Sequence, residues 1–67
     1  MKFNERLKEA RLYKQLKTTE VALQLEITER AYYYYEKGCR EPSLELLVKI
    51  CKLLDVSADY LLGLSEY

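Results

Sequence analysis

The apolar side chains of this 67-residue chain recur at intervals of three and four residues, and no segment alternates apolar and polar residues with a period of two. The first pattern places apolar side chains on one face of an α-helix, whereas the second is typical of a half-buried strand. The only proline and the two glycines lie between the periodic segments, where they begin or end helices. We therefore predict an all-α fold.

The periodic segments predict five helices, at about residues 3–14, 18–25, 29–37, 43–54 and 57–62. Their expected apolar faces carry Phe3, Leu7 and Ala10, then Val21, Ala22 and Leu25, and then Leu44, Leu47, Ile50, Cys51 and Leu54. Residues that favour helix starts precede or open four of these segments: the pair Thr18-Thr19, Thr28, Ser43 after Pro42, and Ser57. Gly38 and Gly63 are expected to end the third and fifth helices.

Four consecutive tyrosines lie in the third predicted helix. At about 100° per residue they cover most of the helix circumference, so they cannot all face the core. Ala31, Tyr32 and Tyr35 fall on one arc, and the opposite arc carries Glu29, Arg30, Tyr33 and Tyr34. We predict that Tyr32 and Tyr35 pack in the core, where their hydroxyls need partners, and that Tyr33 and Tyr34 are exposed.

Length and composition limit the classes of function. Sixty-seven residues allow one small domain, residues 1–67, and no apolar run suits a membrane span or a signal peptide, so we expect a cytoplasmic protein. The chain has no histidine, and Cys39 and Cys51 do not form a CxxC pair, which predicts reduced thiols, no metal site and no cofactor. Neither a glycine-rich phosphate loop nor a nucleophile with a nearby base is present, so an enzyme is not expected.

The charge distribution is compatible with a modest basic face. The net charge is zero, which by itself argues against nucleic-acid binding. Residues 1–42, however, hold nine Lys and Arg against seven Asp and Glu, whereas residues 43–67 hold two against four.

Two short helices joined by Glu26-Ile27-Thr28 have the spacing of a helix-turn-helix, a weak signal by itself. The stretches RLKEARLYKQL, VALQLEIT and YEKGCREPSLELLVKICKLLDVSADYLLG resemble the Cro and phage-repressor family, or xenobiotic-response-element type, of helix-turn-helix regulators. The resemblance runs from about Arg6 to Gly63, leaving residues 64–67 as a short tail. It implies a compact five-helix bundle from a prokaryote or phage.

The resemblance also implies a function. The family's regulators, often small repressors, bind double-stranded DNA with the third helix in the major groove, commonly as a homodimer on a palindromic operator. Here the last helix and tail, about Tyr60 to Tyr67, are the expected dimer contact. Because the chain ends soon after Gly63, we expect no small-molecule effector domain.

Site residues follow from the family's positions. The DNA-binding candidates are Lys17, Thr18, Thr28, Glu29, Arg30, Tyr33, Tyr34, Lys37 and Arg40. Arg30 suits a guanine edge, and Glu29 suits either a cytosine amino group or the helix dipole. Lys17, Lys37 and Arg40 fit phosphates or plain solvated charges. The resemblance further implies a structural ion pair between Arg11 and Glu36.

Three positions depart from the family's pattern. Thr18 replaces a glutamine and cannot make its bidentate contact with adenine. Glu26 replaces a glycine of left-handed conformation, and Tyr32 replaces an aliphatic residue. The zero net charge, Glu26, Glu29 and the two exposed tyrosines leave open an alternative function, a protein-interaction module that has lost operator reading. A third function, single-strand binding by tyrosine stacking, needs a positively charged groove, and Arg30 and Lys37 alone make a poor one.

Overall fold

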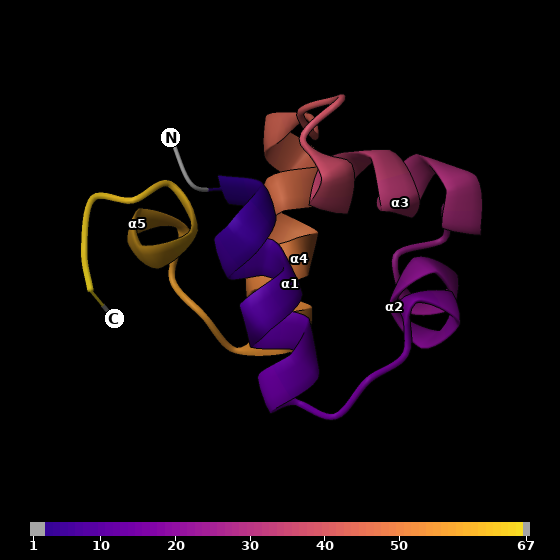
Figure 1. Cartoon of the computed structure of the whole chain (residues 1–67), viewed down its shortest axis with the longest axis horizontal. Helices are drawn as coiled ribbons and strands as arrows, with labels where there is room; N and C mark the ends of the chain where they lie inside the picture. The colour runs from indigo at the N-terminus through magenta and orange to yellow at the C-terminus, as the bar shows by residue number, and fades with distance from the viewer. Residues whose placement is uncertain (1–2, 67) are drawn as a thin grey trace.

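A computed structural model of the protein describes residues 3–66. Its elements are α1 (Phe3–Tyr13), α2 (Thr18–Gln24), α3 (Glu29–Lys37), α4 (Leu44–Leu54) and α5 (Ala58–Leu61). Figure 1 shows these five helices, and residues 3–66 contain no strand, so the all-α prediction is confirmed. In this part of the chain no helix has both the length and the apolar character needed to cross a membrane.

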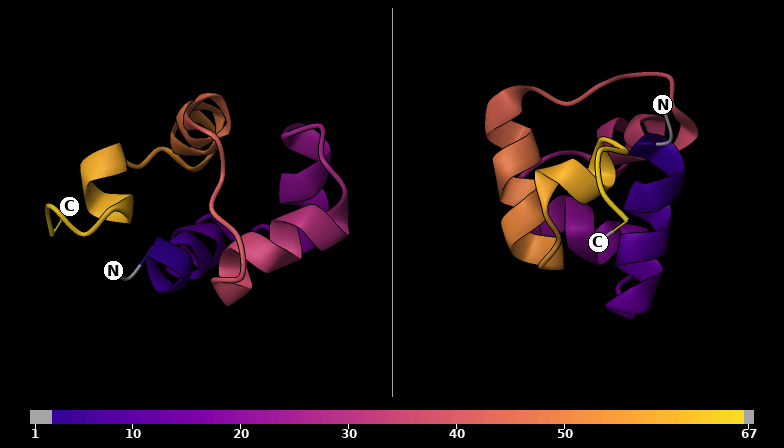
Figure 2. Two further views of the ribbon diagram at one scale, coloured as in Figure 1. Left: turned by 90° about the horizontal axis from the view of Figure 1, so that it is seen from above. Right: turned by 90° about the vertical axis from the view of Figure 1, so that its left-hand side faces the viewer.

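The helices enclose one apolar core. Helices α1 and α4 form two opposite walls, α5 closes one end between them, and α2 with α3 closes the other end (Figures 1 and 2). The buried apolar side chains come from all five helices and the turn after α2: Phe3, Leu7, Ala10, Val21, Ala22, Leu25, Tyr32, Leu47, Ile50, Leu54 and Leu61. The periodicity therefore identified most of the core.

One member of the predicted stripe on α4 lies outside the core. Leu44 is 80% exposed, and the buried side chains of α4 begin one turn later, at Leu47. Cys51 is only partly buried, and burial raises the pKa of its thiol. Cys39 is exposed, and both cysteines are free thiols, as predicted.

Three helices begin with hydroxyl caps, of which those at Thr28 and Ser57 were predicted. The side chains of Thr28, Ser43 and Ser57 each accept a backbone N–H from the first turn of the helix that follows, at 3.1, 3.1 and 3.0 Å. These bonds satisfy donors that a helix start would otherwise leave without partners.

The start of α2 differs from its prediction. Its N-cap is Lys17, in extended conformation, and Thr18 is already the first helical residue, so the prediction of a Thr18-Thr19 cap was wrong. The Glu20 carboxylate accepts the Lys17 backbone N–H at 2.8 Å. This bond from the first turn fixes the start of α2 without a hydroxyl cap.

Two left-handed residues shape the ends of α2 and α3. Glu26, in the turn between them, has φ 59°, as its replacement of a glycine predicted. Gly38 ends α3 with φ 81°, and a Cβ there would lie 3.3 Å from Asn4 Cγ of α1. Gly38 is therefore favoured by its conformation and by the close approach of α1.

Candidate functional site

Helix α3 presents one side to the core and the other to solvent. Tyr32 is fully buried and Tyr35 is partly buried against the core, whereas Tyr33 is 50% exposed. These three positions agree with the division predicted for the tyrosines. Tyr34 is only partly exposed, less than predicted, and the Arg40 guanidinium lies over its ring.

A charged network holds the inner side of α3 against α1. Arg11 Nε donates to Glu36 Oε2 at 2.6 Å and Arg11 Nη2 donates to Glu36 Oε1 at 3.2 Å, which forms the predicted ion pair as a two-pronged contact. The Tyr32 hydroxyl donates to the same carboxylate. The hydrogen bond to Glu36 raises the pKa of Arg11, and burial, followed by the bond to Glu36, raises the pKa of Tyr32.

The same guanidinium also reaches the segment before α2. Arg11 Nη1 donates to the Leu16 carbonyl oxygen at 2.9 Å. One buried side chain on α1 thus fixes α3 through Glu36 and the approach to α2 through Leu16. The arginine thereby helps to set the position of α3 relative to α2.

The exposed side of α3 begins with charged residues. Glu29 and Arg30 occupy the first turn and are exposed, directly after the Thr28 cap. Glu29 lies where a negative charge is favoured by the positive end of the helix dipole. Lys17 and Thr18 lie at the start of α2, with Lys17 exposed and Thr18 partly buried.

Four of the predicted residues form a cluster on the second half of α3 and the segment that follows it. The Lys37 ammonium lies 5.5 Å from the centroid of the Tyr33 ring, and the Arg40 guanidinium lies 5.4 Å from the centroid of the Tyr34 ring. The two ring centroids are 6.2 Å apart, with planes inclined at 59°. We call Tyr33, Tyr34, Lys37 and Arg40 the aromatic–cation cluster. The spacing of four residues between Tyr33 and Lys37 was a readable signal of the first pair.

Arg6 has a role that no sequence pattern indicated. Its Nη1 donates to the carbonyl oxygens of Tyr60, at 2.7 Å, and of Ser65, and its guanidinium lies 4.7 Å from the centroid of the Tyr60 ring. Much of the predicted dimer segment is therefore occupied within the chain, since Leu61 is also buried. Leu64 is 76% exposed, and Tyr67 lies outside the described residues.

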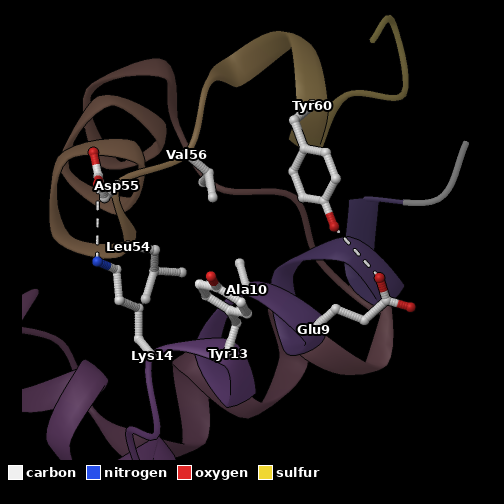
Figure 3. Close-up of a pocket in the computed structure, with 8 residues that line it drawn as sticks. All are labelled: Glu9, Ala10, Tyr13, Lys14, Leu54, Asp55, Val56 and Tyr60. Carbon is white, nitrogen blue, oxygen red and sulfur yellow. Dashed lines mark hydrogen bonds and ion pairs between the residues drawn. The ribbon is translucent and has the colours of Figure 1, made fainter. Parts of the chain in front are cut away.

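A cleft of about 570 Å³ lies between α1, the end of α4 and α5 (Figure 3). It is lined by Glu9, Ala10, Tyr13, Lys14, Leu54, Asp55, Val56 and Tyr60. Lys14 Nζ lies 3.8 Å from Asp55 Oδ2, and the Tyr60 hydroxyl donates to Glu9 at 3.4 Å. The cleft contains none of the nine predicted DNA-binding residues.

The arrangement suits binding by hydrogen bonds and charge. Among residues 3–66, no three His, Cys, Asp or Glu side chains are grouped to hold a metal ion. The exposed side of α3 offers donors from Arg30 and Lys37, and Arg40 adds donors just after the helix, whose other side is fixed in the core. Such a surface recognises groups rich in acceptors, as base edges and phosphates are.

The chain is similar to known regulators. The sequence profile described as "Helix-turn-helix" matches residues 7–61. The uncharacterised HTH-type transcriptional regulator YqaE of Bacillus subtilis is 48% identical over 60 residues, which cover 90% of this chain and 52% of YqaE. The HTH-type transcriptional regulator ImmR of the same organism is 39% identical over 66 residues, covering 98% of this chain and 52% of ImmR.

A third relative is the prophage-derived regulator YonR of B. subtilis, which is 43% identical over 60 residues, covering 90% of this chain and 56% of YonR. The chain thus spans about half the length of these curated relatives. No solved structure matches it.

Proposed function

The chain belongs to the helix-turn-helix family, of the Cro and phage-repressor type, and from this premise we propose that it binds double-stranded DNA as a transcriptional regulator. The observation that carries the proposal is the exposed side of α3, whose inner side is anchored by Arg11, Glu36 and Tyr32. In this proposal α3 enters the major groove with its first turn leading.

In this proposal, side chains in the first turn of α3 recognise the base sequence of the DNA. Arg30 is exposed there, and its fork of donors matches the O6 and N7 acceptors of guanine. Glu29 either accepts from a cytosine amino group or serves the helix dipole alone. Tyr33 follows one turn later, with its ring beside the Lys37 ammonium.

The proposed contacts to DNA phosphates lie on either side of the first turn of α3. The proposed contacts come from Lys17 and Thr18 at the start of α2, Thr28 before α3, and Lys37 and Arg40 at the end of α3 and beyond, with Arg40 lying over the Tyr34 ring. Phosphate contacts set register and orientation on the duplex, and they make affinity depend on salt. Glu26, exposed in the turn between the two helices, opposes binding by its negative charge.

The regulator is proposed to act as a repressor that occupies a palindromic operator as a homodimer. Two copies of α3 must then lie about 34 Å apart, the length of one turn of duplex DNA. Exposed Leu64, next to α5, supports the C-terminal helix and tail as part of the dimer contact.

The test is selection of duplexes from a randomised library, followed by binding titrations over a salt series. We expect affinity to fall steeply with salt and the selected duplexes to form inverted repeats. Arg30→Lys keeps the positive charge and removes the paired donors of the guanidinium. The variant should therefore lose about 1–3 kcal/mol of preference for guanine at one base pair. Lys49→Ala, at an exposed position of α4, is the control for loss of a charge elsewhere.

Two results would overturn the proposal in different ways. Equal affinity for selected and random duplexes would remove sequence-specific regulation. No duplex binding even at low salt would remove DNA binding altogether and would favour the protein-interaction module.

A further inference from the structure

We propose that Tyr33 and Tyr34 are positioning residues whose rings hold Lys37 and Arg40 in place for DNA phosphates before DNA arrives. The inference rests on the proposed function and assigns the aromatic–cation cluster a role within it. In this role the tyrosines act through the cations that they hold.

The geometry of both pairs favours attraction between cation and ring. A cation within about 6 Å of an aromatic centroid is attracted by the negative face of the ring. Lys37 and Arg40 satisfy this at 5.5 and 5.4 Å. Within residues 3–66 neither cation takes part in a salt bridge, so no carboxylate competes with the rings or neutralises the charge.

The end of α3 brings Arg40 back to Tyr34. The left-handed Gly38 reverses the chain, and the Cys39 N–H donates to the Tyr34 carbonyl oxygen at 3.0 Å. Arg40 follows immediately, so its side chain can return over the ring of Tyr34. Tyr34 itself is partly buried, which gives the arginine a fixed platform.

Holding a cation in this way leaves it able to bind phosphate. A guanidinium stacks through its face, whereas it recognises phosphate through the N–H donors at its edge. An ammonium likewise keeps donors that point away from the ring. Because long cationic side chains otherwise lose rotamer freedom on binding, holding them beforehand reduces the entropic cost of the contact.

The experiment is a double-mutant cycle between Tyr34 and Arg40, using the selected duplex and a salt series. Tyr34→Leu should raise Kd roughly two- to fivefold. Arg40→Ala should raise Kd and lower the slope of log K against log salt by about 0.9, the value for one phosphate contact. The double variant should bind no more weakly than Arg40→Ala, because the tyrosine acts only through the arginine.

Tyr34→Phe is the matched control, because it keeps the ring and removes the hydroxyl. It should retain the wild-type Kd and salt slope. A Kd raised by Tyr34→Phe would assign the contact to the hydroxyl and overturn the inference. The inference would also be overturned if the fold-increases in Kd of Tyr34→Leu and Arg40→Ala multiplied in the double variant. The same cycle with Tyr33→Leu and Lys37→Ala tests the second pair.

A measurement on the free protein separates this inference from the proposed function. In NMR spectra, ring-current shifts of the Arg40 side-chain protons should be present in the wild type and in Tyr34→Phe, and lost in Tyr34→Leu. Their absence from the wild type would overturn the inference while DNA binding could still stand. Their presence in a protein that binds no duplex would overturn the proposed function, and the phosphate role of the cluster with it.

Discussion

Replacing Arg11 with alanine removes a cation that joins α1, α3 and the approach to α2. The variant loses both contacts to Glu36 and the bond to the Leu16 carbonyl oxygen. It also leaves the Glu36 carboxylate buried, since the side chains of the ion pair are each only 10% exposed. We therefore expect a large loss of stability.

The structure sets the size of that loss. Removing one partner of a buried ion pair costs about 3–5 kcal/mol, because the other charge stays desolvated. The Tyr32 hydroxyl still donates to Glu36, which places the expected loss near the lower end, at about 3 kcal/mol. At roughly 0.05–0.15 kcal/mol per residue, such a loss is a large share of the stability of a domain of this size.

Urea and thermal denaturation followed by circular dichroism measure the effect. A loss of about 3 kcal/mol corresponds to a fall in Tm of roughly 12–24 °C for a domain of this size. Lys14→Ala is the matched control, because Lys14 and Asp55 are 3.8 Å apart with side chains 38% and 86% exposed. Breaking this surface pair should cost less than about 1 kcal/mol.

A second variant tests the reason for the loss. Arg11→Met keeps an apolar chain but still strands the carboxylate, so adding Glu36→Gln should recover part of the stability. An unchanged Tm for Arg11→Ala would refute the reasoning. So would a double variant that loses the full sum of both single effects, because the stranded charge would then not be the cause.

Three further predictions concern single side chains. Burial and Glu36 raise the pKa of Tyr32, so above about pH 10 the folded state keeps a proton that the unfolded state loses. The free energy of unfolding should then fall by up to ~1.4 kcal/mol per pH unit. Tyr32→Phe should remove this pH dependence in urea titrations. Glu26→Gly should raise the unfolding free energy by about 0.5–1 kcal/mol by relieving positive φ, whereas Glu26→Gln should leave stability unchanged and tighten duplex binding. Thr28→Ala should lower the Tm through the loss of about 1 kcal/mol from the α3 cap.

Local signals predicted most of the fold. Periodicity placed the helices and most core residues, and the bounds of α3 followed from Thr28 and Gly38 because a cap and a left-handed stop act on their own neighbours. At α2 the local signal misled, since the Glu20 carboxylate fixes the helix start where Thr18 was expected to cap it.

Local sequence patterns could not predict contacts between residues that are far apart in the chain. Arg6 and Ser65 are joined across 59 positions, and an arginine on an amphipathic helix looks like any solvated charge. The Arg11–Glu36 pair was found only through the family resemblance. Arg40 over Tyr34 depends on how the chain reverses at Gly38, which residue spacing does not encode.

The Arg6 contacts have a practical consequence for attaching this domain to a surface. By holding the carbonyls of Tyr60 and Ser65 against α1, Arg6 keeps the tail at the end of the bundle away from α2 and α3 (Figures 1 and 2). A biotin or fluorophore linked behind this tail leaves α3 open to a long duplex. A label attached near the start of α1 is a worse choice. Asn4 lies close to Gly38 at the end of α3, so a label there would crowd the approaching DNA.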